Sequence, residues 1–171
     1  INTSSQETRK LGRRACRYLG LTERTYRKTL SALRAHLDVV ERKMSAGKWD
    51  EIDFESVPSV AMSRYIKTYN KRCQERFAAY KAALEKGVAK VNAATLYSYD
   101  ITEKYLYGRG LDPVDEAQWK ALPNYVNGEY DVVVMADVSG SMYGKPMATS
   151  IGLATYFAQR NKGAYHNLYL T

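Results

Sequence analysis

The sequence predicts a mainly α-helical chain, with a bundle or array of helices over residues 1–126 and the first βαβ unit of an α/β domain over residues 127–171. Three observations lead to this prediction. Apolar residues recur at intervals of three and four through the first part, which is the spacing of one helix face. Glycine and proline interrupt the pattern at short intervals. A β-branched run replaces it near residue 130.

The first part is expected to form successive amphipathic helices with short connections. One helix should end at Leu19, because Gly20 can adopt the left-handed conformation that terminates a helix. A long helix should follow from the N-cap Thr22 to about Ser45. Further helices are expected from Pro58 onwards and over residues 71–86, 101–107 and 112–122.

Residues 130–136, with the sequence YDVVVMA, are short, β-branched and almost uncharged. Such a run predicts a strand buried on both faces, as in parallel sheets covered by helices. A helix over residues 147–159 and a second strand over residues 164–171 would complete one βαβ unit. So short a unit cannot form a covered sheet alone.

The positive charge of the chain, +8 in total, is concentrated at its N-terminal end. Residues 1–36 contain nine Lys or Arg and two Glu. A basic region of this kind attracts polyanions such as RNA or DNA, and the alternative is a solvated face that keeps the protein soluble. The candidate RNA-binding residues are Arg9, Lys10, Arg13, Arg14, Arg17, Arg24, Arg27 and Lys28.

A second candidate site is the loop that follows the first expected strand, where Asp137, Ser139 and Ser141 form the pattern D-x-S-x-S. Ligands of open α/β sheets bind at the carboxyl ends of strands. One carboxylate and two hydroxyls suit a hard cation such as Mg²⁺ or Mn²⁺. The alternative is a turn and helix cap that binds no metal.

The run YDVVVMADVSGSM over residues 130–142 resembles the first strand and metal-ion-dependent adhesion site (MIDAS) of a von Willebrand factor A (vWA) domain, a Rossmann-like α/β fold. The resemblance implies that Asp137, Ser139 and Ser141 ligate the metal. It also implies that an acidic residue of a partner protein completes the coordination. In that family a Thr and a second Asp from later loops complete the site, and this chain contains neither, so metal binding is expected to be weak.

Four further segments resemble an uncharacterised family that joins a helical region to a C-terminal vWA-like domain. They are LGLTERTYRKTLSALR (19–34), DVVERKMS (38–45), WDEIDFESVPSVAM (49–62) and KVNAATLYSYDI (90–101). The layout is similar to that of the TROVE proteins, the Ro autoantigen family, which bind small noncoding RNAs with a ring of helical repeats. By fold-level analogy, this resemblance implies a small structured or single-stranded RNA as partner.

Catalysis, as metal-dependent phosphoryl transfer or hydrolysis, is a minor alternative. The run GSMYGKP over residues 140–146 resembles a phosphate-binding loop, but it is one residue short and has Pro where Ser or Thr would hold Mg²⁺. An aspartyl-phosphate mechanism would use Asp137, but Ser139 stands where such enzymes place a second Asp. We therefore expect a non-enzymatic binding protein, with a protein-interaction scaffold that binds no nucleic acid as the alternative.

Fifteen tyrosines are many for a chain of this length, and five of them lie near the expected junction of the two regions, at Tyr97, Tyr99, Tyr105, Tyr107 and Tyr125. They can stack on unpaired bases, but the favoured interpretation is that they seal a helix interface.

Cys16 and Cys73 belong to no paired or metal-binding pattern, so free thiols are expected. Free thiols suit an intracellular, cytoplasmic location. No apolar run approaches the ~20 residues of a membrane span, and the first residues do not resemble a signal peptide.

Overall fold

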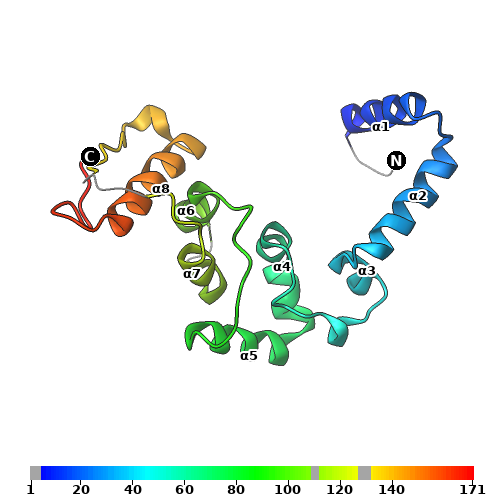
Figure 1. Cartoon of the computed structure of the whole chain (residues 1–171), viewed down its shortest axis with the longest axis horizontal. Helices are drawn as coiled ribbons and strands as arrows, with labels where there is room; N and C mark the ends of the chain where they lie inside the picture. Colours follow the sequence, from blue (N-terminus) through cyan, green and yellow to red (C-terminus); the bar gives the residue numbers. More distant parts are fainter. Residues whose placement is uncertain (1–4, 109–111, 127–131) are drawn as a thin grey trace. The chain divides into compact units, whose positions relative to one another are not determined.

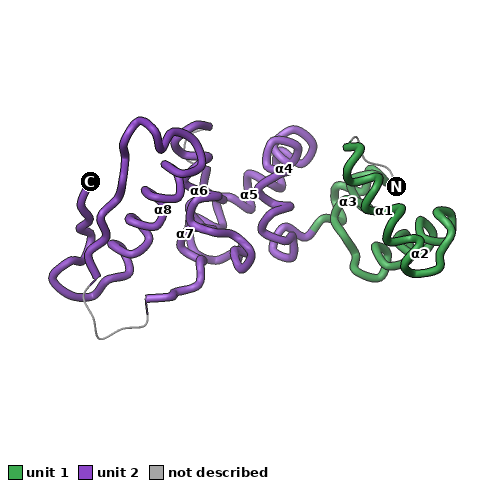
Figure 2. The backbone as a smooth tube through the Cα atoms, turned by 90° about the horizontal axis from the view of Figure 1, so that it is seen from above, with its two compact units in different colours: residues 1–52 green, residues 53–171 purple. Residues whose placement is uncertain are grey.

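The computed structural model describes residues 5–108, 112–126 and 132–171. The chain divides into two compact units, Ile1–Ile52 and Asp53–Thr171 (Figure 2). Within the described ranges every regular element is a helix, and no strand forms. Each of these helices is too short or too polar to cross a lipid bilayer.

The helices of unit 1 are closed by local capping interactions. Its elements are α1 Gln6–Tyr18, α2 Glu23–His36, α3 Val40–Ser45 and the 3-10 turn η1 Trp49–Glu51 (Figure 1). After α1, Gly20 takes a φ of +63° and the Leu21 N–H donates to the Cys16 carbonyl at 2.9 Å, as in a Schellman motif. Thr22 then begins α2, because its Oγ1 accepts the Thr25 N–H at 3.1 Å.

The long helix expected from Thr22 to about Ser45 is two helices. α2 ends at His36, and Asp38 takes a φ of +46°. The Val39 N–H donates back to the Arg34 carbonyl at 3.4 Å, which closes the end of α2. Asp enters this left-handed region more readily than most residues, because its short polar side chain can hydrogen-bond locally. The apolar spacing continues across the break and therefore did not reveal it.

Unit 1 buries few side chains. Cys16 of α1 and Val40 of α3 are buried, whereas α2 has no fully buried residue. Large apolar side chains of these helices and their C-caps are instead exposed, namely Leu11 and Leu33 within α1 and α2 and the C-cap residues Leu19 and Leu37. These two helices therefore present an apolar surface as well as a basic one.

The helices of unit 2 enclose two hydrophobic clusters. Its elements are α4 Ser59–Arg72, α5 Gln74–Glu85, α6 Ser98–Tyr107, α7 Pro113–Lys120, the 3-10 turn η2 Gly140–Met142 and α8 Lys145–Arg160. In the first cluster the ring of Phe54 packs edge-on against Tyr69 at 5.4 Å and Phe77 at 5.1 Å. Tyr69 and Phe77 are fully buried, so these aromatic contacts join α4 to α5.

The second cluster joins α6, α7 and α8. Its buried members are Ala93, Leu96, Ile101, Trp119, Leu122 and Tyr156. The Trp119 Nε1–H donates to the Gln159 Oε1 at 2.6 Å, which ties α7 to α8. Lys104 of α6 pairs with Asp115 of α7 at 2.8 Å, so the three helices are also linked by polar contacts.

The βαβ unit expected over residues 127–171 is not formed, so the predicted α/β part of the fold class is wrong. Residues 127–131, which include the beginning of the first expected strand, lie outside the described range. Beyond them, the Leu170 N–H donates to the Val134 carbonyl at 2.9 Å and the Ala136 N–H donates to the Leu170 carbonyl at 2.7 Å. These bonds make an isolated parallel bridge between Met135 and Leu170, not a pair of strands.

Exposure explains why the bridge does not extend into a sheet. Met135 is 77% exposed and Leu170 is 52% exposed. Strands of a parallel sheet gain their stability by being covered on both faces. A two-stranded pair that leaves these side chains in water gains too little to extend its ladder. The helix between the two segments forms as expected, as α8.

The domain boundary predicted between residues 126 and 127 adjoins residues outside the described range, and it stays a prediction. It falls within the second compact unit. The division between the units lies much earlier, between Ile52 and Asp53, directly after η1. Nothing in the apolar spacing indicated that point.

Candidate functional site

One face of α1 is basic. Arg9, Arg13 and Arg17 follow one another at steps of four residues, and Lys10 and Arg14 lie beside them. Because an α-helix has about 3.6 residues per turn, these five side chains share less than half of its circumference. All five are exposed to solvent.

The basic face continues on α2, where Arg24, Arg27 and Lys28 are also exposed. The Arg27 Nε–H donates to the Glu23 carbonyl at 3.2 Å, and the Glu23 carboxylate pairs with Arg13 at 3.4 Å. The side chains of that pair are 68% and 47% exposed, so the pair contributes little to stability. The eight cations that the sequence predicted are all exposed on the surface of unit 1.

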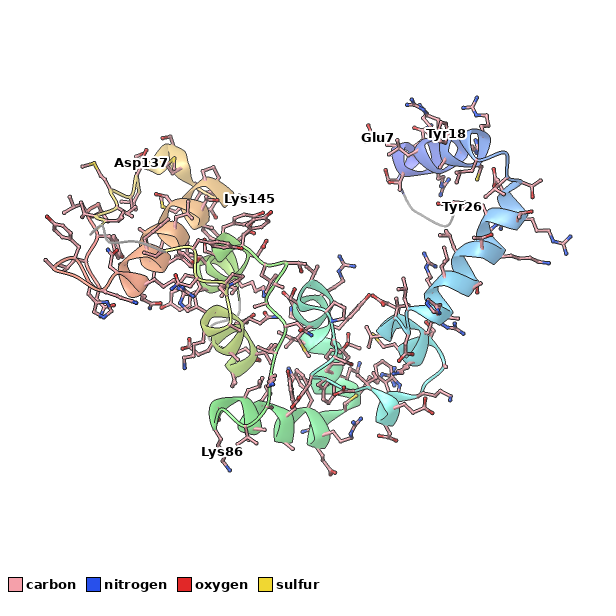
Figure 3. All side chains as sticks on the ribbon, viewed as in Figure 1. Glu7, Tyr18, Tyr26, Lys86, Asp137 and Lys145 are labelled. Carbon is pink, nitrogen blue, oxygen red and sulfur yellow. The ribbon has the colours of Figure 1, made fainter. Side chains whose placement is uncertain are left out.

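Few acidic groups offset this charge. The sequence places only Glu7 and Glu23 among its first 36 residues. Tyr18, which is 92% exposed, is the last residue of α1 (Figure 3). Closely spaced cations with an exposed aromatic ring make a surface suited to polyanions.

The loop before α8 contains Asp137, which is labelled in Figure 3, and also Ser139 and Ser141. The Ser139 N–H donates to the Asp137 Oδ1 at 2.9 Å, and the hydroxyl oxygens of Ser139 and Ser141 lie 3.2 Å apart. The backbone N–H of Ser139, and then its hydroxyl, hold the pKa of Asp137 below its ordinary value. The loop is thus closed by hydrogen bonds among the residues that the sequence predicted as metal ligands.

This arrangement also fits a loop that holds itself together ahead of a helix. It supplies one carboxylate, and its two hydroxyls already hydrogen-bond to each other. Among the described residues, no group of three or more His, Cys, Asp or Glu gathers elsewhere to bind a metal. Mg²⁺ or Mn²⁺ binding at Asp137 therefore stays a prediction.

A cleft of about 550 Å³ lies in unit 2 between α6, α7 and α8. Its lining includes Ile101, Tyr105, Ile151 and the ion pair of Lys104 with Asp115. The volume lies within the range of small-molecule sites. Sequence reasoning missed this cleft, because its walls come from three helices and no local motif marks it.

The comparison with known families covers most of the chain. Residues 2–129 match the family described as Domain of unknown function (DUF2828). The chain belongs to this family. It is also 34% identical over 169 residues to "Uncharacterized protein L728" of Acanthamoeba polyphaga mimivirus, across 90% of this chain and 30% of that protein. The DUF2828 chain thus spans about 30% of the length of this relative. No solved structure matches it.

This assignment corrects the family prediction. The resemblance to vWA and TROVE proteins is wrong: the matching family is DUF2828, and the described residues contain no strand from which a vWA sheet could begin. The MIDAS interpretation of the Asp137 loop and the idea of TROVE-type helical repeats are therefore withdrawn. The loop pattern was misleading because Asp and Ser also serve as turn and cap residues.

The tyrosines of the DUF2828 chain differ from the favoured prediction. Four of the five, Tyr97, Tyr105, Tyr107 and Tyr125, are exposed within unit 2. Tyr99 is half-buried, and its ring lies against Lys145 of α8. Tyr156 of α8 does pack into a helix interface, since it is 5% exposed and donates to the Pro123 carbonyl. Its position in an apolar stripe of small residues was the available signal.

Proposed function

We propose that this DUF2828 chain is a non-enzymatic nucleic-acid-binding protein that holds RNA on the basic faces of α1 and α2. The observation that carries the proposal is the exposure of eight Lys and Arg side chains on these two helices. Two glutamates are the only acidic residues among the first 36. A phosphate backbone binds such a surface by releasing its condensed counterions.

Arginine makes up most of this face, which suits it to bind phosphate groups. Six of the eight candidate residues are Arg and two are Lys. The planar guanidinium donates two parallel hydrogen bonds to phosphate, which the ammonium of Lys cannot do. We place the protein in the cytoplasm as part of the same proposal, since Cys16 and Cys73 are free thiols.

A second candidate function is a protein-interaction scaffold that binds no nucleic acid. The observation in its favour is the set of exposed leucines on α1 and α2, with Leu11 at 62% and Leu33 at 51%. Exposed apolar patches commonly mark protein interfaces. The two functions differ in their response to salt, since counterion release makes RNA binding strongly salt-dependent and apolar contacts do not.

Two variants matched in charge test the proposal. K10Q/R14Q/R17Q removes three cations from one face of α1, and R64Q/K67Q/K71Q removes three exposed cations from one face of α4. Affinity for a labelled single-stranded RNA is measured by fluorescence anisotropy at about 0.1 M salt. The first variant should bind roughly ten-fold more weakly or worse, while the second should change little.

Equal losses in both variants would mean that net charge alone attracts the RNA, and would overturn the assignment to unit 1. Absence of salt-sensitive RNA binding by the unmodified protein would favour the scaffold. Binding of the unmodified protein to vesicles that contain phosphatidylserine is measured as well. If they bind more tightly than RNA at the same salt concentration, the basic face is a membrane surface, and the nucleic-acid proposal fails.

A further inference from the structure

Two tyrosine rings at the beginning of α6 form a parallel stack. The ring centroids of Tyr97 and Tyr99 lie 5.5 Å apart, and the angle between the ring planes is 8°. Lys145, the first residue of α8, places its Nζ 4.3 Å from the centroid of the Tyr99 ring. Tyr97 is 66% exposed. These three residues form a surface that we call the tyrosine platform.

The platform is held in place by its own backbone. The Tyr97 N–H donates to the Asp100 Oδ2 at 2.9 Å, which fixes the first turn of α6. α8 lies alongside α6 (Figures 1 and 3), and a Cβ at Gly152 would be 3.2 Å from the Tyr99 nitrogen. Rings that are ordered before binding lose little entropy when a ligand stacks on them.

A second pair of rings joins α6 to the loop before α8. Tyr107 and Tyr143 have centroids 5.1 Å apart, and the Gly144 N–H donates to the Tyr107 hydroxyl at 3.1 Å. Tyr143 is 77% exposed. Aromatic side chains thus lie at both ends of α6, so more than one base has a ring to stack on.

The chemistry of the platform selects its ligand. Flat exposed rings bind flat aromatic groups, and each base stacked on an aromatic side chain strengthens binding roughly ten-fold. The ammonium of Lys145 attracts phosphate and disfavours a cationic peptide. Bases within a duplex already stack on each other, so their faces are open only in single strands, loops and ends.

We propose that the tyrosine platform stacks unpaired bases, so that the nucleic acid bound at unit 2 is single-stranded. This inference rests on the proposed function, since it assumes that the chain binds nucleic acid. It adds a base-dependent contact in unit 2 to the phosphate-dependent surface in unit 1. Removal of the bases should abolish the contact in unit 2 and leave the phosphate contact in unit 1, so an experiment can measure the two contacts separately.

The test compares an oligouridylate of about 12 nucleotides with an abasic oligomer of the same length and charge. The unmodified protein should bind the oligouridylate roughly ten-fold more tightly than it binds the abasic oligomer. It should show the same preference over an oligouridylate that is base-paired with its complementary strand. Tyr97→Leu should remove most of this preference. Tyr97→Phe, which keeps the ring and removes only the hydroxyl, should preserve it. Binding of the abasic oligomer should be the same in all three proteins.

Each other outcome is decisive. Equal affinity of the unmodified protein for the two oligomers would overturn the platform and leave the proposed function standing. The platform is equally overturned if Tyr97→Leu, folded by near-ultraviolet circular dichroism, keeps the full preference. If neither oligomer binds in a salt-dependent way, the proposed function itself has failed. The comparison within the unmodified protein needs no variant, so misfolding of Tyr97→Leu cannot mask the result.

Discussion

Gly152 of α8 lies so close to Thr102 of α6 that a Cβ at position 152 would be 2.8 Å from the Thr102 Oγ1. The hydroxyl has little freedom to move away, because it is buried and donates to the Ser98 carbonyl at 3.0 Å. The same Cβ would be 3.2 Å from backbone atoms of Ser98 and Tyr99. α6 and α8 therefore pack almost backbone to backbone, and only glycine fits at the crossing.

We expect Gly152→Ala to destabilise unit 2 by about 1–3 kcal/mol, because the added methyl overpacks this crossing. Gly140→Ala is the matched control, since nothing lies within 4 Å of a Cβ at that position. Thermal unfolding followed by near-ultraviolet circular dichroism gives both melting temperatures. Equal melting temperatures for the two variants would contradict the close packing of α6 and α8.

Tyr80 makes the stability of unit 2 sensitive to alkali. Its pKa is raised to about 12, first by burial and then by the carboxylates of Glu55 and Asp53. Its hydroxyl also donates to the Lys90 carbonyl at 2.8 Å. A raised folded-state pKa means that the native protein keeps its proton after the unfolded chain has lost it, so stability falls as pH rises from about 10 to about 12.

At pH 11 this loss should be on the order of 1 kcal/mol relative to neutral pH. Tyr80→Phe lacks the titrating group and should lose less stability over the same range. Urea unfolding of both proteins at neutral pH and at pH 11 measures the difference, because the other tyrosines are common to both. If the two proteins lose the same stability, Tyr80 does not titrate in this way.

The ion pair between Lys104 and Asp115 is largely buried, with side chains 18% and 8% exposed. Lys104→Met leaves the Asp115 carboxylate without this partner in a poorly hydrated position, and should destabilise unit 2 by about 2–4 kcal/mol. Lys120→Met breaks the exposed pair with Glu116 and should cost less than about 1 kcal/mol. A similar cost for both variants in urea unfolding would refute the role assigned to burial.

The loop at Asp137 predicts weak binding of Mg²⁺, with a dissociation constant of about a millimolar or higher, because it offers a single carboxylate. Isothermal titration calorimetry with Mg²⁺ should give heat that disappears in Asp137→Ala. Asp53→Ala, which removes a carboxylate elsewhere in unit 2, is the control and should leave the heat unchanged. Equal heats from unmodified protein and Asp137→Ala would mean that the loop is a turn and cap only.

Most helices were predictable because their signals are local. Gly20 ended α1 and Thr22 began α2 as expected, since one residue decides each of these caps. The break at Asp38 was missed, because a left-handed aspartate interrupts the helix without interrupting the apolar spacing. The prediction of parallel strands was wrong. A strand is stable only when other strands and covering helices pack against it, and the run over residues 130–136 does not reveal whether these are present.

The candidate sites divide in the same way. The basic residues of α1 could be placed on one face from their spacing alone, since helix geometry fixes it. Lys145 could not be linked to Tyr99, because α6 and α8 meet only in the folded unit. The residues of the motif at Asp137 hydrogen-bond to one another. Their metal chemistry was inferred from a family to which the chain does not belong, and it stays a prediction.

The most direct test of the central claim is the salt dependence of RNA affinity. Each phosphate neutralised on a single strand contributes about −0.7 to the slope of log K against log salt. Contacts from five to eight cations of unit 1 predict a slope of about −3 to −6, and K10Q/R14Q/R17Q should make it shallower by about 2. A slope near zero, or one unchanged in that variant, would contradict RNA binding by the basic faces of α1 and α2.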